Sequence, residues 1–195
     1  MSSETQEAGH VVGQLGPGAL ALVVGASGAG KDALISGARA SLANDPRFAF
    51  PERVVTRPSH GAEDHGSLSD AAFADAERRG SFAITWEAHG LRYGVPVSID
   101  EAIRNGRTVI VNGSRATIDT VCRRYARTAI ILVECPIGIR AARLALRGRE
   151  PPASVEARLM RKVAAFDPAD ADVRIDNSGA IEDGVRALVA ALQSL

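Results

Sequence analysis

The sequence predicts an α/β protein built on a parallel sheet with helices on both faces. Three observations favour this fold class: short apolar strands alternate with helical segments, a glycine-rich turn joins the first strand to the first helix, and an irregular insert separates the second and third strands. A chain of 195 residues favours a single domain. We expect residues 1–18 to form a flexible tail and residues 19–195 to form that domain.

Short runs of apolar and β-branched residues predict the strands. Five runs are expected to form the sheet: Leu20–Val24, Arg53–Thr56, Thr108–Val111, Ala129–Val133 and Val173–Ile175. Helices are predicted where apolar residues recur at helical spacing between start and stop signals. Outside the insert these are Lys31–Leu42, Ile99–Asn105, Ser114–Arg124, Ile137–Leu146, Ser154–Phe166 and Ile181–Leu192.

The insert, residues 57–97, is predicted to be a subdomain over the carboxyl-terminal edge of the sheet, where ligands of such sheets bind. It begins with a loop over Ser59–Ser69, and Ser69 is placed to cap a helix that runs to Arg79 before Gly80. Two short strands follow, Phe82–Glu87 and Leu91–Tyr93. Phe73, Phe82 and Trp86 are expected to form its small core.

Composition excludes several classes of protein. Twenty-three basic residues balance twenty-three acidic ones, so there is no general attraction to nucleic acid or to an anionic membrane. The longest apolar runs have five or six residues, far fewer than a membrane span needs. Cys122 and Cys135 form neither a metal motif nor a disulfide framework. The start lacks the order of a signal peptide, so we expect a cytoplasmic protein, and its oligomeric state stays open.

A phosphate-binding loop is the strongest motif. The segment from Gly25 to Asp32 matches the G-x-x-x-x-G-K pattern between a strand and a helix, as in P-loop nucleotide-binding proteins. Its glycines allow backbone N–H groups to turn onto a phosphate, and Lys31 can reach the β- and γ-phosphates of ATP. The predicted nucleotide-binding residues are Gly25, Ala26, Ser27, Gly28, Ala29, Gly30, Lys31 and Asp32.

Asp32 replaces the Ser or Thr that usually follows the lysine and binds Mg²⁺. Two interpretations stand side by side. The carboxylate could be a direct or water-mediated Mg²⁺ ligand, since hard oxygen donors suit this cation. Alternatively, it only favours the helix N-terminus, which is worth ~0.3–1 kcal/mol.

Motifs beyond the loop carry a family resemblance. They are Thr56-Arg57, Trp86 with Tyr93-Gly94, the arginine-rich segment around Arg147, Arg158 and Asp176-Asn177. This layout resembles the guanylate kinase family over almost the whole chain after residue 18. The resemblance implies a P-loop kinase with an acceptor-binding insert and an arginine-rich lid over residues 147–158.

The sequence departs from true guanylate kinases where they bind guanine. Thr85 stands where those enzymes have a base-binding glutamate, Arg53 replaces a small hydroxyl residue, and His60 replaces a second arginine. Asn112-Gly113-Ser114-Arg115 and the Lys31-Asp32 pair make the pattern similar to the ribose 1,5-bisphosphate phosphokinases of bacterial phosphonate catabolism. This resemblance implies ATP-dependent phosphorylation of the C1 phosphate of a phosphorylated pentose, giving 5-phosphoribosyl 1-diphosphate.

Residue roles follow from this comparison and from chemistry. Lys31, Arg147 and Arg158 are the predicted catalytic residues, with a solvated basic face as the alternative for the two arginines. Arg57 is the first candidate for the acceptor phosphate, because a guanidinium matches phosphate bidentately. The further acceptor candidates are Arg53, His60, His65, Tyr93 and Arg115. Asp176 and Asn177 match the family's adenine region, and a strand-ending turn is the other interpretation.

Three other functions compete. A guanylate kinase is disfavoured by Thr85 and Arg53. A gluconate- or shikimate-type kinase would favour a carboxylate base near its hydroxyl acceptor, whereas a phosphate acceptor is already ionised and needs none. A binding module without catalysis need not keep Gly30, Lys31 and the lid arginines, all of which are present.

Overall fold

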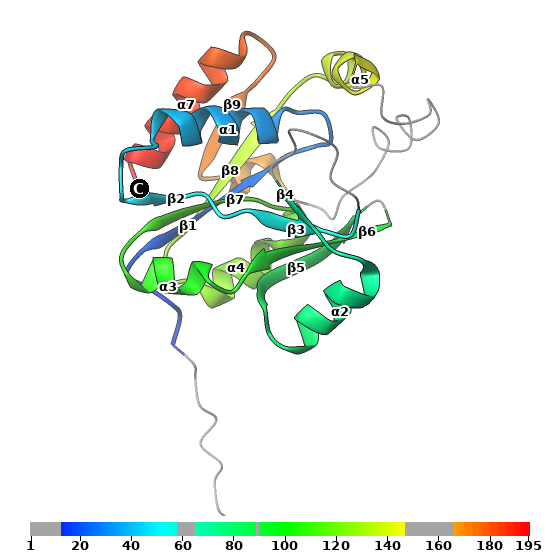
Figure 1. Ribbon diagram of the computed structural model, residues 1–195. Coiled ribbons are helices and arrows are strands. Elements are labelled where there is room, and N and C mark those ends of the chain that lie inside the picture. Colours follow the sequence, from blue (N-terminus) through cyan, green and yellow to red (C-terminus); the bar gives the residue numbers. More distant parts are fainter. Residues whose placement is uncertain (1–12, 58–64, 89, 147–165) are drawn as a thin grey trace, which may run out of the picture.

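The main sheet consists of five parallel strands at the centre of the molecule (Figure 1). The computed structural model describes residues 13–57, 65–88, 90–146 and 166–195. Across the sheet the strands run β2 (Phe48–Ala49), β7 (Thr108–Asn112), β1 (Ala19–Val24), β8 (Thr128–Glu134) and β9 (Val173–Asp176). The predicted fold class, a parallel sheet in an α/β protein, is confirmed.

Helices cover both faces of this sheet because its central strand is buried on both sides. In Figure 1, α1 (Lys31–Ser41) and α7 (Ile181–Gln193) lie above it, and α3 (Ile99–Arg104) and α4 (Ile118–Arg124) lie below it. Every residue of β1 is buried, and alternate side chains point to opposite faces. One core cluster therefore includes Ala21 and Val23, and the other includes Leu20, Leu22 and Val24.

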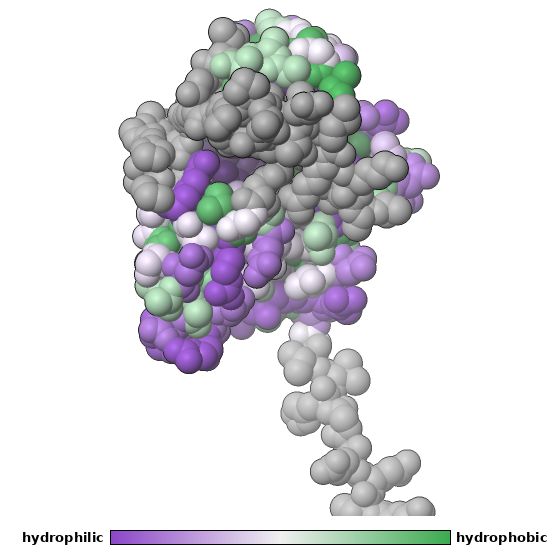
Figure 2. Space-filling view, turned by 90° about the vertical axis from the view of Figure 1, so that its right-hand side faces the viewer, coloured by the Kyte–Doolittle hydropathy of each residue, from purple (hydrophilic) through white to green (hydrophobic). Residues whose placement is uncertain are grey.

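The insert forms a second sheet of four strands. In order across the sheet these are β4 (His65–Ser67), β3 (Arg53–Val55), β6 (Leu91–Pro96) and β5 (Phe82–Ala88). Its helix α2 (Asp70–Arg78) begins after Ser69, whose hydroxyl accepts a hydrogen bond from the Ala72 N–H at 3.2 Å, as the predicted cap requires. Figure 2 views this side of the molecule, and its lower half is mainly hydrophilic.

The predicted core of the insert, Phe73, Phe82 and Trp86, is confirmed for the two phenylalanines, whereas Trp86 packs against the core of the main sheet. Phe73 is fully buried and stacks on Phe82 with the ring centroids 4.7 Å apart. Trp86 on β5 stacks on Tyr93 on β6 at 5.1 Å, across the antiparallel pair that these two strands form. Ile84 on β5 and Val95 on β6 are buried in the same core cluster as Leu20 and Leu22 of β1, so the small sheet packs against the main sheet.

Two strand predictions were wrong in detail. The segment predicted over Arg53–Thr56 is β3 of the small sheet, and the fifth strand of the main sheet is the two-residue β2. So short a strand has no hydrophobic period. It is placed by its pairing with β7, and Arg107 donates to the carbonyls of Pro46 (3.0 Å) and Phe48 (2.6 Å). The insert therefore begins at β3, before residue 57, and part of its predicted opening loop forms the strand β4.

The remaining elements agree with their predicted positions. Ser114 caps the short helix Arg115–Thr117 that leads into α4, and α5 spans Ile137–Leu146. Another 3-10 turn spans Pro168–Asp170. The predicted break at 147–153 and most of the helix predicted over 154–166 lie outside the described residues.

Residues 14–18, within the predicted tail, are held against the domain. The Leu15 N–H donates to the Arg124 carbonyl at 2.9 Å, the Ala126 N–H donates to Leu15 at 2.8 Å, and the Gly18 N–H donates to Ile103 at 2.9 Å. The tail prediction therefore applies at most to the residues before these. Within the described part of the chain, no helix has the length and apolar character to cross a membrane.

Candidate active site

The glycine-rich loop lies at the carboxyl end of β1 and leads into α1, as predicted. Two glycines are sterically required. A Cβ at Gly25, where φ is 152°, would lie 2.3 Å from the Val133 carbonyl oxygen, and one at Gly30, where φ is 96°, would lie 2.3 Å from Nδ2 of Asn177. Because the chain packs this closely, the loop keeps the tight path that phosphate-binding loops need.

Lys31 is the first residue of α1, and its side chain folds back over the loop. Its Nζ donates to the carbonyl of Gly25 at 2.8 Å and lies 3.3 Å from that of Ala26. The ammonium is thus held beside the loop and next to the positive end of the helix dipole. This is the arrangement that the motif predicts for a cation that binds phosphate.

Asn177, at the end of β9, supports the loop from behind. Its side chain is 1% exposed, and its Nδ2 donates to the Ala29 carbonyl at 2.7 Å. Its own N–H donates to Glu134 at 2.9 Å. Asp176 is exposed and accepts from the Ser178 N–H at 2.9 Å. The pair has the geometry of a strand-ending turn, and the implied adenine contact stays a prediction.

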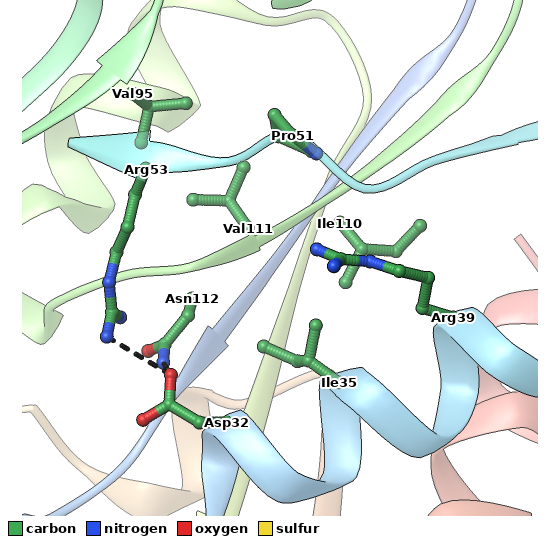
Figure 3. A pocket seen from close by; sticks show the side chains of 9 residues that line it. All are labelled: Asp32, Ile35, Arg39, Pro51, Arg53, Val95, Ile110, Val111 and Asn112. Atoms are coloured by element: carbon green, nitrogen blue, oxygen red, sulfur yellow. Dashed lines mark hydrogen bonds and ion pairs between the residues drawn. The ribbon is translucent and has the colours of Figure 1, made fainter. Parts of the chain in front are cut away.

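The side chain of Asp32 points toward Arg53 and Asn112 (Figure 3). Its Oδ1 accepts from Nη2 of Arg53 at 3.1 Å and from Nδ2 of Asn112 at 2.5 Å. The three residues come from α1, β3 and β7, so they join the nucleotide-binding half to the insert. Both interpretations from the sequence missed these two partners.

This cluster lies at one side of a pocket between α1, the small sheet and β7. The pocket is small and partly open to solvent, with about 40 Å³ of space for water-sized molecules. Besides the cluster, it is lined by Ile35, Arg39, Pro51, Val95, Ile110 and Val111. The cluster provides polar groups at one side, Arg39 adds a charge at the other, and apolar side chains lie between them.

The other acceptor candidates that the structure describes lie on β6 or shortly after β3 and β7. Tyr93 stacks on Trp86, and the guanidinium of Arg53 lies 5.8 Å from the Tyr93 ring centre. Arg57 follows β3, and its carbonyl accepts from the Ser67 hydroxyl at 2.5 Å. Arg115 begins the short helix after β7. His60, Arg147, Arg158 and the side chain of His65 lie outside the described residues.

Sequence reasoning missed two residues beside the site. Arg140 on α5 donates to the carbonyls of Cys135 (3.1 Å) and Ser27 (3.4 Å), so it contacts the loop directly. Asn112 was noted only as part of a motif. Arg140 and Arg143 are three residues apart, a spacing that puts two residues on one face of a helix, and this spacing is the signal that could have found Arg140.

Comparison with known proteins agrees with this geometry. A scan against models of protein families finds no match. Two curated relatives are the ribose 1,5-bisphosphate phosphokinase PhnN of Pseudofrankia inefficax, 45% identical over 88% of both chains, and that of Brucella melitensis, 41% identical over 91% of this chain and 93% of the relative. Among solved structures, a guanylate kinase from Anaplasma phagocytophilum is similar with a TM-score of 0.64 at 14% identity, covering 93% of this chain and 87% of that one.

The parallel sheet, the glycine-rich loop and the lysine that opens α1 define a P-loop kinase with a guanylate-kinase-like fold. Within that class, sequence identities of 45% and 41% to the two curated relatives, over 88% and 91% of this chain, show the family. The chain belongs to the ribose 1,5-bisphosphate phosphokinase family.

Proposed function

We propose that this protein transfers the γ-phosphoryl group of ATP to the C1 phosphate of ribose 1,5-bisphosphate, giving 5-phosphoribosyl 1-diphosphate and ADP. The observation that carries the proposal is the pocket in which Arg53 stands opposite the first turn of α1, beside the phosphate loop. A cation at this place suits a phosphorylated acceptor. The identity to the curated kinases supports the same reaction.

The loop and Lys31 form the donor half. Backbone N–H groups of the loop and the N-terminus of α1 would bind the ATP phosphates, and Lys31 would move from its loop carbonyls to the β- and γ-phosphates. Arg140 and Arg143 extend this basic surface along α5. Such a site accelerates phosphoryl transfer by positioning the groups and by neutralising their charge.

Mg²⁺ enters the proposal as the partner of ATP. Among the described residues no group of three or more His, Cys, Asp or Glu side chains could hold a metal ion. Asp32 is a poor fit for a resident cation, because Nη2 of Arg53 lies 3.1 Å from its carboxylate. Mg²⁺ commonly binds through substrate phosphates and water, and we assign it to the nucleotide.

The acceptor half needs cations and no base, because a phosphate is ionised at neutral pH. Arg57 is the proposed ligand of the acceptor phosphate, assisted by Arg53, Arg115 and Tyr93. His60 and His65 belong to the same half, and Arg147 and Arg158 are proposed to close over the transferring group as the lid. Support for these last four comes from the family resemblance alone.

Selection against a purine follows from Thr85. It is exposed on β5, opposite Gly94 in the strand pairing. A threonine hydroxyl cannot accept from two guanine N–H groups as a carboxylate can. GMP should therefore be a poor acceptor.

An assay with two acceptors tests the reaction. The purified protein is given ATP and Mg²⁺ with either ribose 1,5-bisphosphate or GMP, and ³¹P NMR identifies the product. A diphosphate signal from the sugar and little GDP would support the proposal, whereas rapid GDP formation without a sugar product would refute it. Arg57→Ala should raise the KM for the sugar by about 10- to 100-fold. Arg78→Ala removes an exposed arginine paired with Asp75 and is the matched control.

A further inference from the structure

The cluster of Asp32, Arg53 and Asn112 bears on which sugar the enzyme accepts. Asp32 is 58% exposed at its side chain, whereas Arg53 is 18% exposed. A surface carboxylate rarely receives two side-chain donors from segments 21 and 80 residues away unless the fold brings them to one place. Here that place is a pocket wall beside the phosphate loop.

The position of Asp32 in the phosphate-loop motif places it near the phosphoryl group that is transferred. Asp32 follows Lys31 directly, at the position where P-loops place a Ser or Thr hydroxyl on the Mg²⁺ that accompanies the nucleotide phosphates. A group that contacts the Asp32 carboxylate would therefore lie close to the phosphoryl group that is transferred. In ribose 1,5-bisphosphate the group next to the reacting C1 phosphate is the hydroxyl on C2.

We propose that Asp32 accepts a hydrogen bond from the C2 hydroxyl of the acceptor sugar and makes the kinase select ribose over 2-deoxyribose. This inference rests on the proposed function, because it assigns the sugar-binding part of that same site. Asp32 is then a specificity-determining residue, and Asn112 positions its carboxylate.

The chemistry of the cluster suits a hydroxyl. The two oxygens of an ionised carboxylate together accept up to about four hydrogen bonds, so a carboxylate can bind a hydroxyl while its Oδ1 accepts from Arg53 and Asn112. A lone carboxylate would repel a phosphorylated sugar, but the guanidinium of Arg53 offsets this charge. Asn112 donates to the carboxylate through Nδ2, which fixes the direction in which Asp32 points. Val95, Ile110 and Val111 offer apolar contacts to the sugar carbons.

A metal role and a purely structural role predict different behaviour. A metal ligand would not distinguish the two sugars and would change the Mg²⁺ requirement. A structural link between α1 and the small sheet would, when broken, lower stability and slow both sugars equally. Only contact with the hydroxyl makes the preference itself depend on Asp32.

The test compares ribose 1,5-bisphosphate with 2-deoxyribose 1,5-bisphosphate as acceptors for the full-length protein. The wild type should prefer ribose by about 10- to 100-fold in kcat/KM, as expected for a hydrogen bond to a charged group. Asp32→Ala should reduce this preference to less than about threefold, by losing activity on ribose while keeping it on 2-deoxyribose. Asn112→Ala should reduce the preference partly, since it only releases the carboxylate.

Asp32→Ser is the sharpest variant because it restores the residue that P-loops usually place there as a Mg²⁺ ligand. It should lose the ribose preference, and Asp32→Ala should do so without raising the Mg²⁺ concentration that gives half the maximal rate. Asp45→Asn is the matched control, a half-buried carboxylate paired with Arg47 outside this pocket, and should change neither quantity. Retention of the ribose preference in both Asp32 variants would overturn the inference.

Failure of the proposed reaction gives a separate result. If the wild type binds both sugars and phosphorylates neither, the reaction is wrong. The ratio of the two Kd values from titration calorimetry, in wild type and Asp32→Ala, then decides the hydroxyl contact. If neither sugar binds at all, both proposals are wrong.

Discussion

Removal of the Asn177 side chain should weaken both the fold and ATP binding. The side chain is 1% exposed, and its Nδ2 donates to the carbonyl of Ala29, which is itself fully buried, at 2.7 Å. An unsatisfied buried carbonyl costs about 1–3 kcal/mol. Oδ1 of Asn177 has no hydrogen-bond partner in the described part of the chain, so its loss offsets some of this cost. We expect Asn177→Ala to lower the free energy of unfolding by about 1–2 kcal/mol.

The same hydrogen bond orients a phosphate ligand. In a trans peptide the C=O and the following N–H point in opposite directions. The Ala29 carbonyl points to Asn177, so the Gly30 N–H points away from it, to the opposite side of the loop. Without Asn177 this peptide can rotate, and we expect the KM for ATP to rise by about fivefold to tenfold, the equivalent of about 1 kcal/mol.

Urea denaturation measures the first effect, and steady-state kinetics with each substrate varied in turn measures the second. The KM for the sugar should stay within about twofold, because Asn177 lies behind the nucleotide side of the site. Asn105→Ala, at an exposed asparagine after α3, is the control. A variant that loses stability while its KM for ATP is unchanged would refute the role assigned to the Ala29–Gly30 peptide.

Three further changes probe the proposed catalytic lysine, a buried hydroxyl and the insert. Lys31→Ala should lower kcat by about 10²- to 10³-fold, far more than its loss of two hydrogen bonds to loop carbonyls lowers the melting temperature, as a coupled ADP assay and thermal unfolding would show. The Tyr125 hydroxyl donates to Asp100 at 2.9 Å, and burial raises the pKa of this hydroxyl above its usual value. The hydrogen bond therefore stabilises the fold fully below about pH 10, and this stabilisation is lost as the pH rises further. Urea denaturation should show Tyr125→Phe about 1 kcal/mol less stable at pH 8, with a smaller alkaline loss than the wild type. A Cβ at Gly94 would lie 2.6 Å from the Phe82 ring, so Gly94→Ala should destabilise by about 1–3 kcal/mol and raise the KM for the sugar.

Local signals explain the predictions that the structure confirms. The segment Gly25–Lys31 is recognisable because its strand, glycine-rich turn and helix are adjacent in the chain. Ser69 and Ser114 cap helices through contacts two or three residues away. Such interactions are encoded within a few residues, so pattern and spacing are enough to predict them.

Membership of a strand in one sheet or the other depended on distant partners. The segment Arg53–Val55 has a typical strand composition, but its neighbours β4 and β6 place it in the small sheet. β2 pairs with β7 some 60 residues later, and only two residues are involved. Register and sheet order are set by which surfaces pack together, which the local sequence does not specify.

The sequence by itself determined a P-loop kinase and the residues of its phosphate loop, because adjacent residues create that motif. Only the tertiary structure showed that Asn177 supports the loop and that Asp32 meets Arg53 and Asn112. These contacts join segments 21 to 148 residues apart. A polar side chain takes whichever partner the packed fold brings within about 3 Å, and that partner is decided by topology rather than by spacing along the chain.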